Sequence, residues 1–210
     1  MEIAFNKDTN VQCKKPTFLS NNKNKQKFVD MLADALREVY VEVITCHADA
    51  DVAIVLKAIE KVADSNTVLV GDDTDLIAIG IHYYKDAATE NGLYMYRKSS
   101  DTCIDFKKLL SGMPKPIKDT ILAIHAASGC DTVSALFGIG KLKLFKICEK
   151  SPDAHIIDLN QFYQENIDID VLVEAGTRLT VKLYDKDQKH DTMEAPRLWQ
   201  VINYRLIIII

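Results

Sequence analysis

The sequence predicts an α/β protein in which a parallel-sheet core is followed by a helical C-terminal extension. The β-branched run 41–45 and the apolar run 67–71 have the composition of buried strands. Between them, segment 52–62 carries apolar residues at the spacing of an amphipathic helix. Strand, helix and strand within about 30 residues is typical of a parallel βαβ unit. After residue 131 helical patterns dominate, and they predict the extension.

The remaining elements are predicted from apolar periodicity and from the turn residues that bound it. In chain order they are a polar loop over 1–25, a helix over 28–36, a helix over 74–84, a strand over 92–98, a helix that opens at Pro114 and Pro116 and runs through 124, helical patterns over 132–138 and 141–150 separated by the glycines of 138–140, and one or two helices over 153–184.

The composition excludes several classes of protein. A chain of 210 residues fits one domain of ordinary size, or one domain with a short appendage. Its 26 Lys and Arg residues against 30 Asp and Glu residues give a net charge of −4, which excludes a histone-like polycation. Any contact with nucleic acid must therefore come from a local basic patch.

Cysteine usage and hydropathy indicate where the protein acts. The five cysteines are scattered and none forms a CxxC pair, which is typical of a reducing intracellular compartment. The first 15 residues lack the apolar core of a secretory signal, and no run approaches the roughly 20 apolar residues of a membrane span. We therefore expect an intracellular protein without a membrane partner. From the four isoleucines at the C-terminus we expect either a truncated chain or a reading-frame artefact.

Acidic residues follow the predicted strands at three places. Asp49 and Asp51 come after the first strand, Asp73 and Asp75 with the adjacent Asp72 after the second, and Asp131 stands before the helical part. If the strands are parallel, the first two clusters lie on one edge of the sheet, where such folds bind ligands. Carboxylates select Mg²⁺ or Mn²⁺, and a pair of these ions about 4 Å apart supports phosphoryl displacement.

Helix capping is the alternative interpretation of these acids. Aspartate is common at helix N-termini, where it accepts hydrogen bonds from free N–H groups and meets the positive end of the dipole. Asp49, Asp51 and Asp75 each have a position that suits this role. For any one of them capping is the simpler explanation, whereas the three clusters in this order favour a metal site.

The order ADAD (48–51), VLVGDDTDL (68–76) and SGCDTVSALFGIGK (128–141) resembles the PIN-like core of the flap endonuclease and XPG superfamily of structure-specific nucleases. The segment SGCDT…FGIGK is similar in sequence to the corresponding segment of a group of uncharacterised animal proteins with this core. The resemblance implies a PIN-like, Rossmann-like core over 26–150 that includes a helix-turn-helix element. Residues 1–25 would then be a lead-in segment and 151–210 the helical extension.

The resemblance also implies roles for individual residues. Asp49 and Asp51 match the first acidic pair of the family, Asp73 and Asp75 the second, and Asp131 the aspartate of the GCD motif. In the family these carboxylates hold two divalent metals that activate water for phosphodiester hydrolysis. The expected cofactor is thus Mg²⁺ or Mn²⁺, the expected partner is nucleic acid, with DNA favoured over RNA, and the expected location is the nucleus.

The GIGK segment would contact a phosphate of the nucleic acid. Glycine permits close approach of the backbone, and the following helix N-terminus favours an anion, so Gly138 and Gly140 fit this role. Lys141, Lys143 and Lys146 follow on one short helix and would supply the local positive charge. The alternative is a solvated lysine face on an amphipathic helix.

The chain departs from the family at its N-terminus. The family begins with a strand that carries an aspartate and continues with basic residues before the first acidic pair, and no such strand precedes Asp49. This predicts an N-terminally incomplete copy with part of the metal shell missing. His125, on the apolar side of its predicted helix, is expected to be a hydrogen-bonded core histidine.

Three functions remain open from the sequence. The first is a metal-dependent nuclease of the 5′ type. The second is a catalytically inactive PIN-like module that binds nucleic acid or protein. The third, a phosphatase of the haloacid-dehalogenase type, would use Asp49 and Asp51 as its DxD motif, but only about 20 residues separate them from Asp73 and Asp75.

Overall fold

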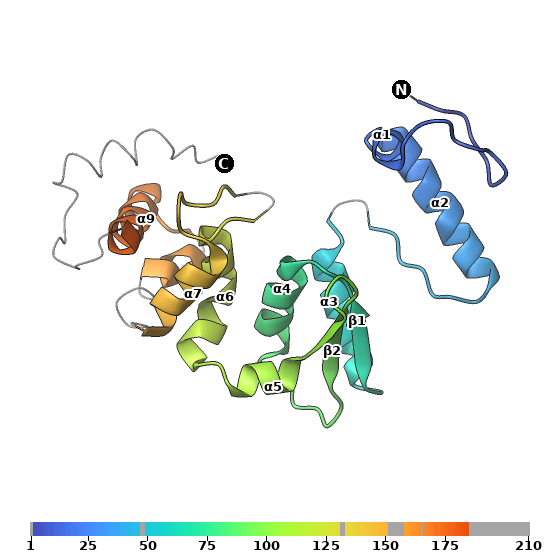
Figure 1. The fold of residues 1–210 in the computed structure, drawn as a ribbon. Helices are drawn as coiled ribbons and strands as arrows, with labels where there is room; N and C mark the ends of the chain where they lie inside the picture. The colour runs from blue at the N-terminus through green and yellow to red at the C-terminus, as the bar shows by residue number, and fades with distance from the viewer. Residues whose placement is uncertain (1, 47–48, 131–132, 151–157, 165, 185–210) are drawn as a thin grey trace. The chain divides into compact units, whose positions relative to one another are not determined.

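The computed structural model describes residues 2–46, 49–130, 133–150, 158–164 and 166–184 (Figure 1). The chain forms two compact units, Met1–Ala50 and Asp51–Ile210. They are called here the N-terminal unit and the C-terminal unit. None of the described helices is long and apolar enough to span a membrane.

The N-terminal unit contains helices α1 (Lys15–Leu19) and α2 (Asn22–Glu38). Asn21 caps α2, because its side chain accepts hydrogen bonds from two backbone N–H groups of the first turn. The predicted helix over 28–36 is confirmed as part of α2, whereas the predicted strand over 41–45 is wrong. Residues 41–46 have no regular structure, because β-branched residues form a strand only where a partner strand accepts their hydrogen bonds.

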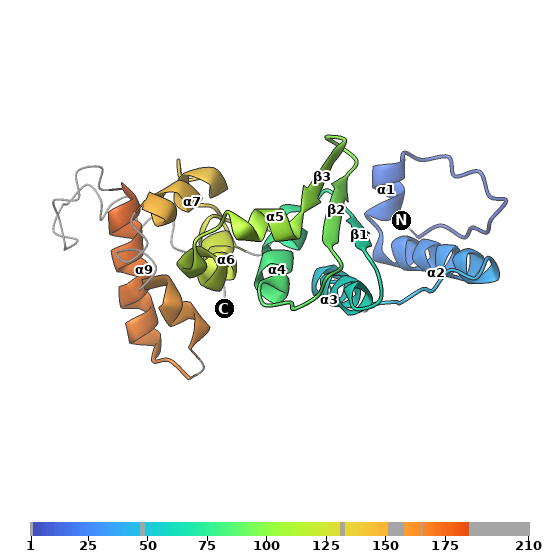
Figure 2. The same cartoon turned by 90° about the horizontal axis from the view of Figure 1, so that it is seen from below.

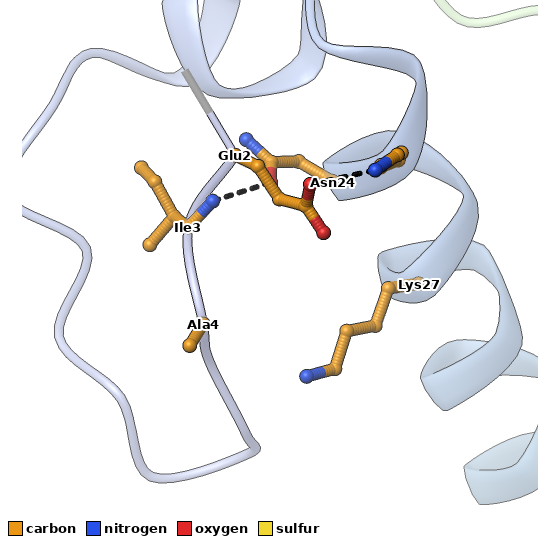
Figure 3. A pocket seen from close by; sticks show the side chains of 6 residues that line it. Glu2, Ile3, Ala4, Asn24 and Lys27 are labelled. Atoms are coloured by element: carbon orange, nitrogen blue, oxygen red, sulfur yellow. Dashed lines mark hydrogen bonds and ion pairs between the residues drawn. The ribbon is translucent and has the colours of Figure 1, made fainter.

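A hollow of about 410 Å³ lies between the N-terminal segment and α2 (Figure 3). The buried Asn24 fixes the segment here, since its Oδ1 accepts a hydrogen bond from the Ile3 N–H and its Nδ2 donates to the Phe18 carbonyl. Lys23 pairs with Glu2 at 2.8 Å. Of the charged residues that line this hollow, Glu2 and Lys23 hold the segment in place, and Lys27 stands over the ring of Phe5.

The C-terminal unit is a mixed α/β fold with a small sheet. Its strands are β1 (Thr67–Val70), β2 (Leu93–Arg97) and β3 (Thr102–Asp105), in the order β1-β2-β3. β1 pairs with β2 in parallel through the crossover helix α4 (Thr74–Tyr84), and β2 pairs with β3 in the antiparallel direction. The parallel pairing is therefore confirmed for β1 and β2 alone, and the sheet as a whole is mixed. Its βαβ unit is β1-α4-β2 and not the predicted unit that began at residue 41.

Helices α3 (Asp51–Val62) and α4 lie on one face of the sheet, as Figure 2 shows. Leu69 of β1 is buried beneath them, whereas Val68 and Val70 on the other face are more than half exposed. Helix α5 (Phe106–Ser111) closes the end of this core with Phe106, which is fully buried.

A second hydrophobic core joins the later helices, α6 (Lys115–Ala127), α7 (Lys141–Lys150) and α9 (Ile169–Tyr184). The segment Gln161–Tyr163 adds a short 3₁₀ helix. The predicted helices over 74–84 and 141–150 are confirmed, as are the strand over 92–98 and the helix that opens at the two prolines. The spacing of Leu144, Ile147 and Cys148 predicts that all three face inward; Leu144 and Cys148 are fully buried, whereas Ile147 is only partly buried and lines a hollow on the surface.

The predicted helical pattern over 132–138 is wrong in its described part. Gly129 has φ +93° directly after α6, and a bridge between Cys130 and Val133 follows it. A turn then places Gly138 at φ +71°. Two left-handed backbone positions that suit glycine bound this segment, so a helix cannot continue through either end.

Gly80 of α4 leaves room for the ring of Phe106, and this contact gives a test of the packing. A Cβ at position 80 would lie 2.4 Å from the ring, which is buried and cannot turn away. We expect Gly80→Ala to lower the free energy of unfolding by about 1 to 2 kcal/mol, because overpacking exceeds the gain in helix propensity.

Gly112→Ala is the matched control, since a Cβ there would meet nothing closer than 3.9 Å and the backbone φ is −85°. Urea unfolding compares the two variants. Equal stability of both would contradict the described packing of α4 on α5.

Candidate nucleic-acid interface

Asp73 ends the loop after β1 and caps helix α4. Its carboxylate accepts a hydrogen bond of 3.0 Å from the Asp75 N–H, and this hydrogen bond is the main reason why the pKa of Asp73 is lowered. The capping role therefore falls on Asp73, while Asp75 lies in the first turn of the helix. Both carboxylates stand at the carboxyl end of β1, as the sequence predicts, where the helix dipole favours negative charge.

The carboxylate of Asp75 on α4 contacts side chains from two other helices, α6 and α7. Nε2 of His125 on α6 lies 2.9 Å from Asp75 Oδ1, and Nζ of Lys141 on α7 lies 3.7 Å from the same oxygen. Lys141 Nζ also donates a hydrogen bond of 2.8 Å to Thr74 Oγ1. The predicted hydrogen bond of His125 is thus confirmed, although its side chain is 14% exposed and lies at the edge of the core rather than within it.

Asp72 holds the loop that carries these acids. Its Oδ1 accepts hydrogen bonds from the backbone N–H of Ser99 at 2.9 Å and from the Ser99 hydroxyl at 2.6 Å. The hydroxyl contact is the main reason why the pKa of Asp72 is lowered. The Asp72 carbonyl accepts a further hydrogen bond from Arg97 at 3.2 Å. Asp72 has no counterpart in the nuclease motif, and its contacts give it a structural role.

Two of the five predicted metal ligands lie side by side in the described part of the C-terminal unit. Asp73 and Asp75 share one turn, Asp51 begins α3, Asp49 belongs to the N-terminal unit, and Asp131 lies outside the described residues. Within the described part of the chain, no three His, Cys, Asp or Glu side chains form a group that could hold a metal ion. Asp73 and Asp75 alone do not complete a two-ion centre, and the metal site stays a prediction.

A basic hollow of about 650 Å³ lies along one face of α7. The helix begins after Gly140, whose carbonyl accepts the backbone N–H groups of Lys143 and Leu144. The inward face of α7 is fixed by its buried apolar residues, and Lys143, Lys146 and Lys150 lie on the opposite side. The hollow is lined by Gly140, Lys141, Leu142, Lys143, Lys146, Ile147 and Lys150.

Four of the five predicted nucleic-acid contacts line this hollow. Gly138 does not line it, but its carbonyl accepts a hydrogen bond of 3.3 Å from Lys143 Nζ. Lys150 is an addition that the sequence prediction missed, although its position four residues after Lys146 places it on the same helical face. His125 and Asp75 are 50 residues apart in the sequence, so no local pattern predicts their contact.

The start of α7 connects the basic hollow with the acidic turn of α4. Lys141 lines the hollow, and its Nζ reaches Thr74 and Asp75. The acidic turn of Asp73 and Asp75 is thus linked to the start of α7 through Lys141. Comparisons with protein-family models, with curated proteins and with solved structures found no match to this chain.

Proposed function

We propose that this protein binds the sugar-phosphate backbone of nucleic acid through the lysines of α7. The observation that carries the proposal is the hollow of about 650 Å³ along α7, which four lysines line in a protein with a net charge of −4. Lysines on a concave surface attract phosphates and release counterions when they bind.

The local geometry supports a phosphate ligand in particular. Lys143, Lys146 and Lys150 succeed one another on one side of the helix and cover roughly 10 Å along its axis. The space beside the Cα of Gly140 is open, since a Cβ at this position would meet no neighbouring atom within 4 Å. A phosphate oxygen can therefore approach the backbone at the helix start. Contacts of this kind bind the backbone and do not read the base sequence.

The test is a binding titration by fluorescence anisotropy with labelled DNA and RNA over a range of salt concentrations. We expect Lys143→Gln/Lys146→Gln to weaken binding to all sequences and to lower the slope of log affinity against log salt by about 2. Lys61→Gln/Lys108→Gln removes the same charge from α3 and α5, and it is expected to leave this slope unchanged.

Equal slopes for the two double variants would overturn the proposal, because the lysines of α7 would then act only through net charge. Circular dichroism shows whether both variants keep the wild-type helix content. Comparison of DNA with RNA tests the preference for DNA that the resemblance implies.

Metal-dependent hydrolysis of the bound strand is a second candidate function. The observation that favours it is the contact of Lys141 with the turn of Asp73 and Asp75, since a strand bound at the start of α7 would lie near this turn. A bound Mg²⁺ or Mn²⁺ would supply an activated water and charge stabilisation. The two carboxylates alone do not complete its ligand set, so no hydrolytic step is assigned to the described residues.

The two candidates are separated by a cleavage assay with the full chain and labelled oligonucleotides, with Mn²⁺ or with a chelator. Cleavage that requires Mn²⁺ and is lost in Asp75→Asn would support the nuclease. Binding that depends on the α7 lysines without any cleavage would identify a binding protein that lacks activity.

A further inference from the structure

Phe137 is exposed on the turn that leads into α7 and its basic hollow. The backbone N–H of Ile139 donates a hydrogen bond of 3.0 Å to the Leu136 carbonyl and closes a tight turn, with Gly138 in the left-handed conformation at φ +71°. Phe137 occupies the tip of this turn, and its side chain is 68% exposed. Its Cα atom cannot lie more than about 11 Å from that of Gly140, because the two residues are three positions apart in the chain.

Two hydrogen bonds from different helices hold this turn in place. The hydroxyl of Tyr184, at the end of α9, donates to the Phe137 carbonyl at 2.6 Å. Lys143 Nζ, on α7, donates to the Gly138 carbonyl at 3.3 Å. The aromatic ring is therefore presented on a backbone that is already fixed, so a ligand that contacts the ring pays little to order it.

An exposed aromatic ring next to a row of lysines is the combination that binds single-stranded nucleic acid. The lysines neutralise the phosphates, and the flat ring stacks on a base whose face is free. In a duplex the base faces are covered by their neighbours and only their edges are accessible. A second apolar side chain, Leu142, is 67% exposed in the wall of the hollow and extends the surface on which a base can rest.

We propose that the hollow of α7 takes single-stranded nucleic acid, with one base stacked on Phe137 and the adjacent phosphates on the lysines. This inference rests on the proposed function and names the form of its ligand. Base stacking gives the exposed aromatic side chain of Phe137 a role. The backbone conformation of the turn does not require phenylalanine, because any residue that adopts a negative φ fits at this position. Stacking on one aromatic ring contributes about tenfold to affinity.

The experiment compares three labelled probes by anisotropy: a short oligothymidylate, an abasic strand with the same number of phosphates, and a duplex of the same length. The wild-type protein is expected to bind the oligothymidylate about tenfold more tightly than the abasic strand. Phe137→Ala is expected to remove this difference and to leave binding of the abasic strand unchanged, while Phe137→Trp keeps the difference.

Phe162→Ala is the matched control, because Phe162 is also an exposed phenylalanine, at 48%, and does not line the hollow. Equal binding of the oligothymidylate by the wild type and Phe137→Ala, or a preference of the wild type for the duplex, would overturn the stacking proposal. If Lys143→Gln/Lys146→Gln does not weaken binding of any probe, the proposed function itself fails, and the two failures are thus distinguishable.

Discussion

Reversing the charge of three lysines on α7 is expected to lower the affinity for nucleic acid by about 100-fold. Each charge-assisted contact with a phosphate contributes on the order of 1 kcal/mol or more, and three are lost in Lys143→Glu/Lys146→Glu/Lys150→Glu. A factor of ten corresponds to about 1.4 kcal/mol, so the loss of contacts alone accounts for two orders of magnitude. Repulsion between the new carboxylates and the phosphates adds to it.

The helix itself should tolerate these changes. Glu and Lys have similar helix propensities, and the buried residues Leu144 and Cys148 stay in place. We therefore expect the melting temperature of the triple variant to stay close to that of the wild type. A fall in affinity without a fall in melting temperature would localise the effect to the surface of α7.

The control variant is Lys61→Glu/Lys98→Glu/Lys108→Glu, which makes the same change in net charge at exposed positions away from the hollow. Anisotropy titrations at one fixed salt concentration compare the two. If both triple variants lose affinity to the same extent, the attraction is a property of the whole chain and α7 is not the interface.

Much of the fold follows from local sequence patterns. The apolar stripes of α2, α3 and α4 recur at helical spacing within each segment, and such a pattern needs no knowledge of distant residues. The same holds for the lysine face of α7. Its buried positions, Leu144 and Cys148, are visible as a stripe, and the lysines that remain must face outward.

The wrong or missing secondary-structure predictions concern segments whose structure depends on pairing with another strand. Strand β3 and helix α5 were not predicted, because β3 is four residues long and owes its structure to antiparallel pairing with β2. The run 41–45 has the stronger strand composition but gains no such partner in the N-terminal unit. Hydrogen bonds between strands decide both cases, and a single sequence does not contain them.

In the candidate site, too, local features could be predicted from the sequence and contacts between distant residues could not. That acids would follow β1 could be predicted, since the strand and the aspartates are adjacent in the chain. That Asp75 would meet His125 and Lys141 could not, because this contact comes from the packing of α4 against α6 and α7. The consequence for function is direct: a carboxylate already paired with a histidine and a lysine has less freedom to bind a metal ion than its sequence motif suggests.

Replacement of Asp158 by alanine is expected to have the largest effect on stability of any single change considered. Asp158 is 3% exposed and accepts hydrogen bonds from Arg178 Nε at 3.1 Å and from Lys182 Nζ at 2.9 Å, both on α9. Removing one partner of a buried ion pair costs about 3 to 5 kcal/mol. Because Arg178 and Lys182 are 39% and 32% exposed and can turn to water, we expect the lower end, about 3 kcal/mol.

Glu174→Ala provides the control, since Glu174 pairs with the same Arg178 across one helical turn but is 69% exposed. A surface pair of this kind contributes about 0.5 kcal/mol or less. Urea unfolding should therefore separate the two variants clearly, and equal losses would show that burial of Asp158 is not what stabilises α9.

The same variant connects stability to the proposed binding surface. Asp158 anchors α9, α9 ends at Tyr184, and the Tyr184 hydroxyl holds the carbonyl of Phe137. If this chain of contacts fixes the turn, Asp158→Ala should reduce the preference for an oligothymidylate over an abasic strand even under conditions where the protein is still folded. Tyr184→Phe removes only the last hydrogen bond and should reduce that preference without the loss of stability. A preference that is unchanged in both variants would mean that the ring of Phe137 binds without being held in advance.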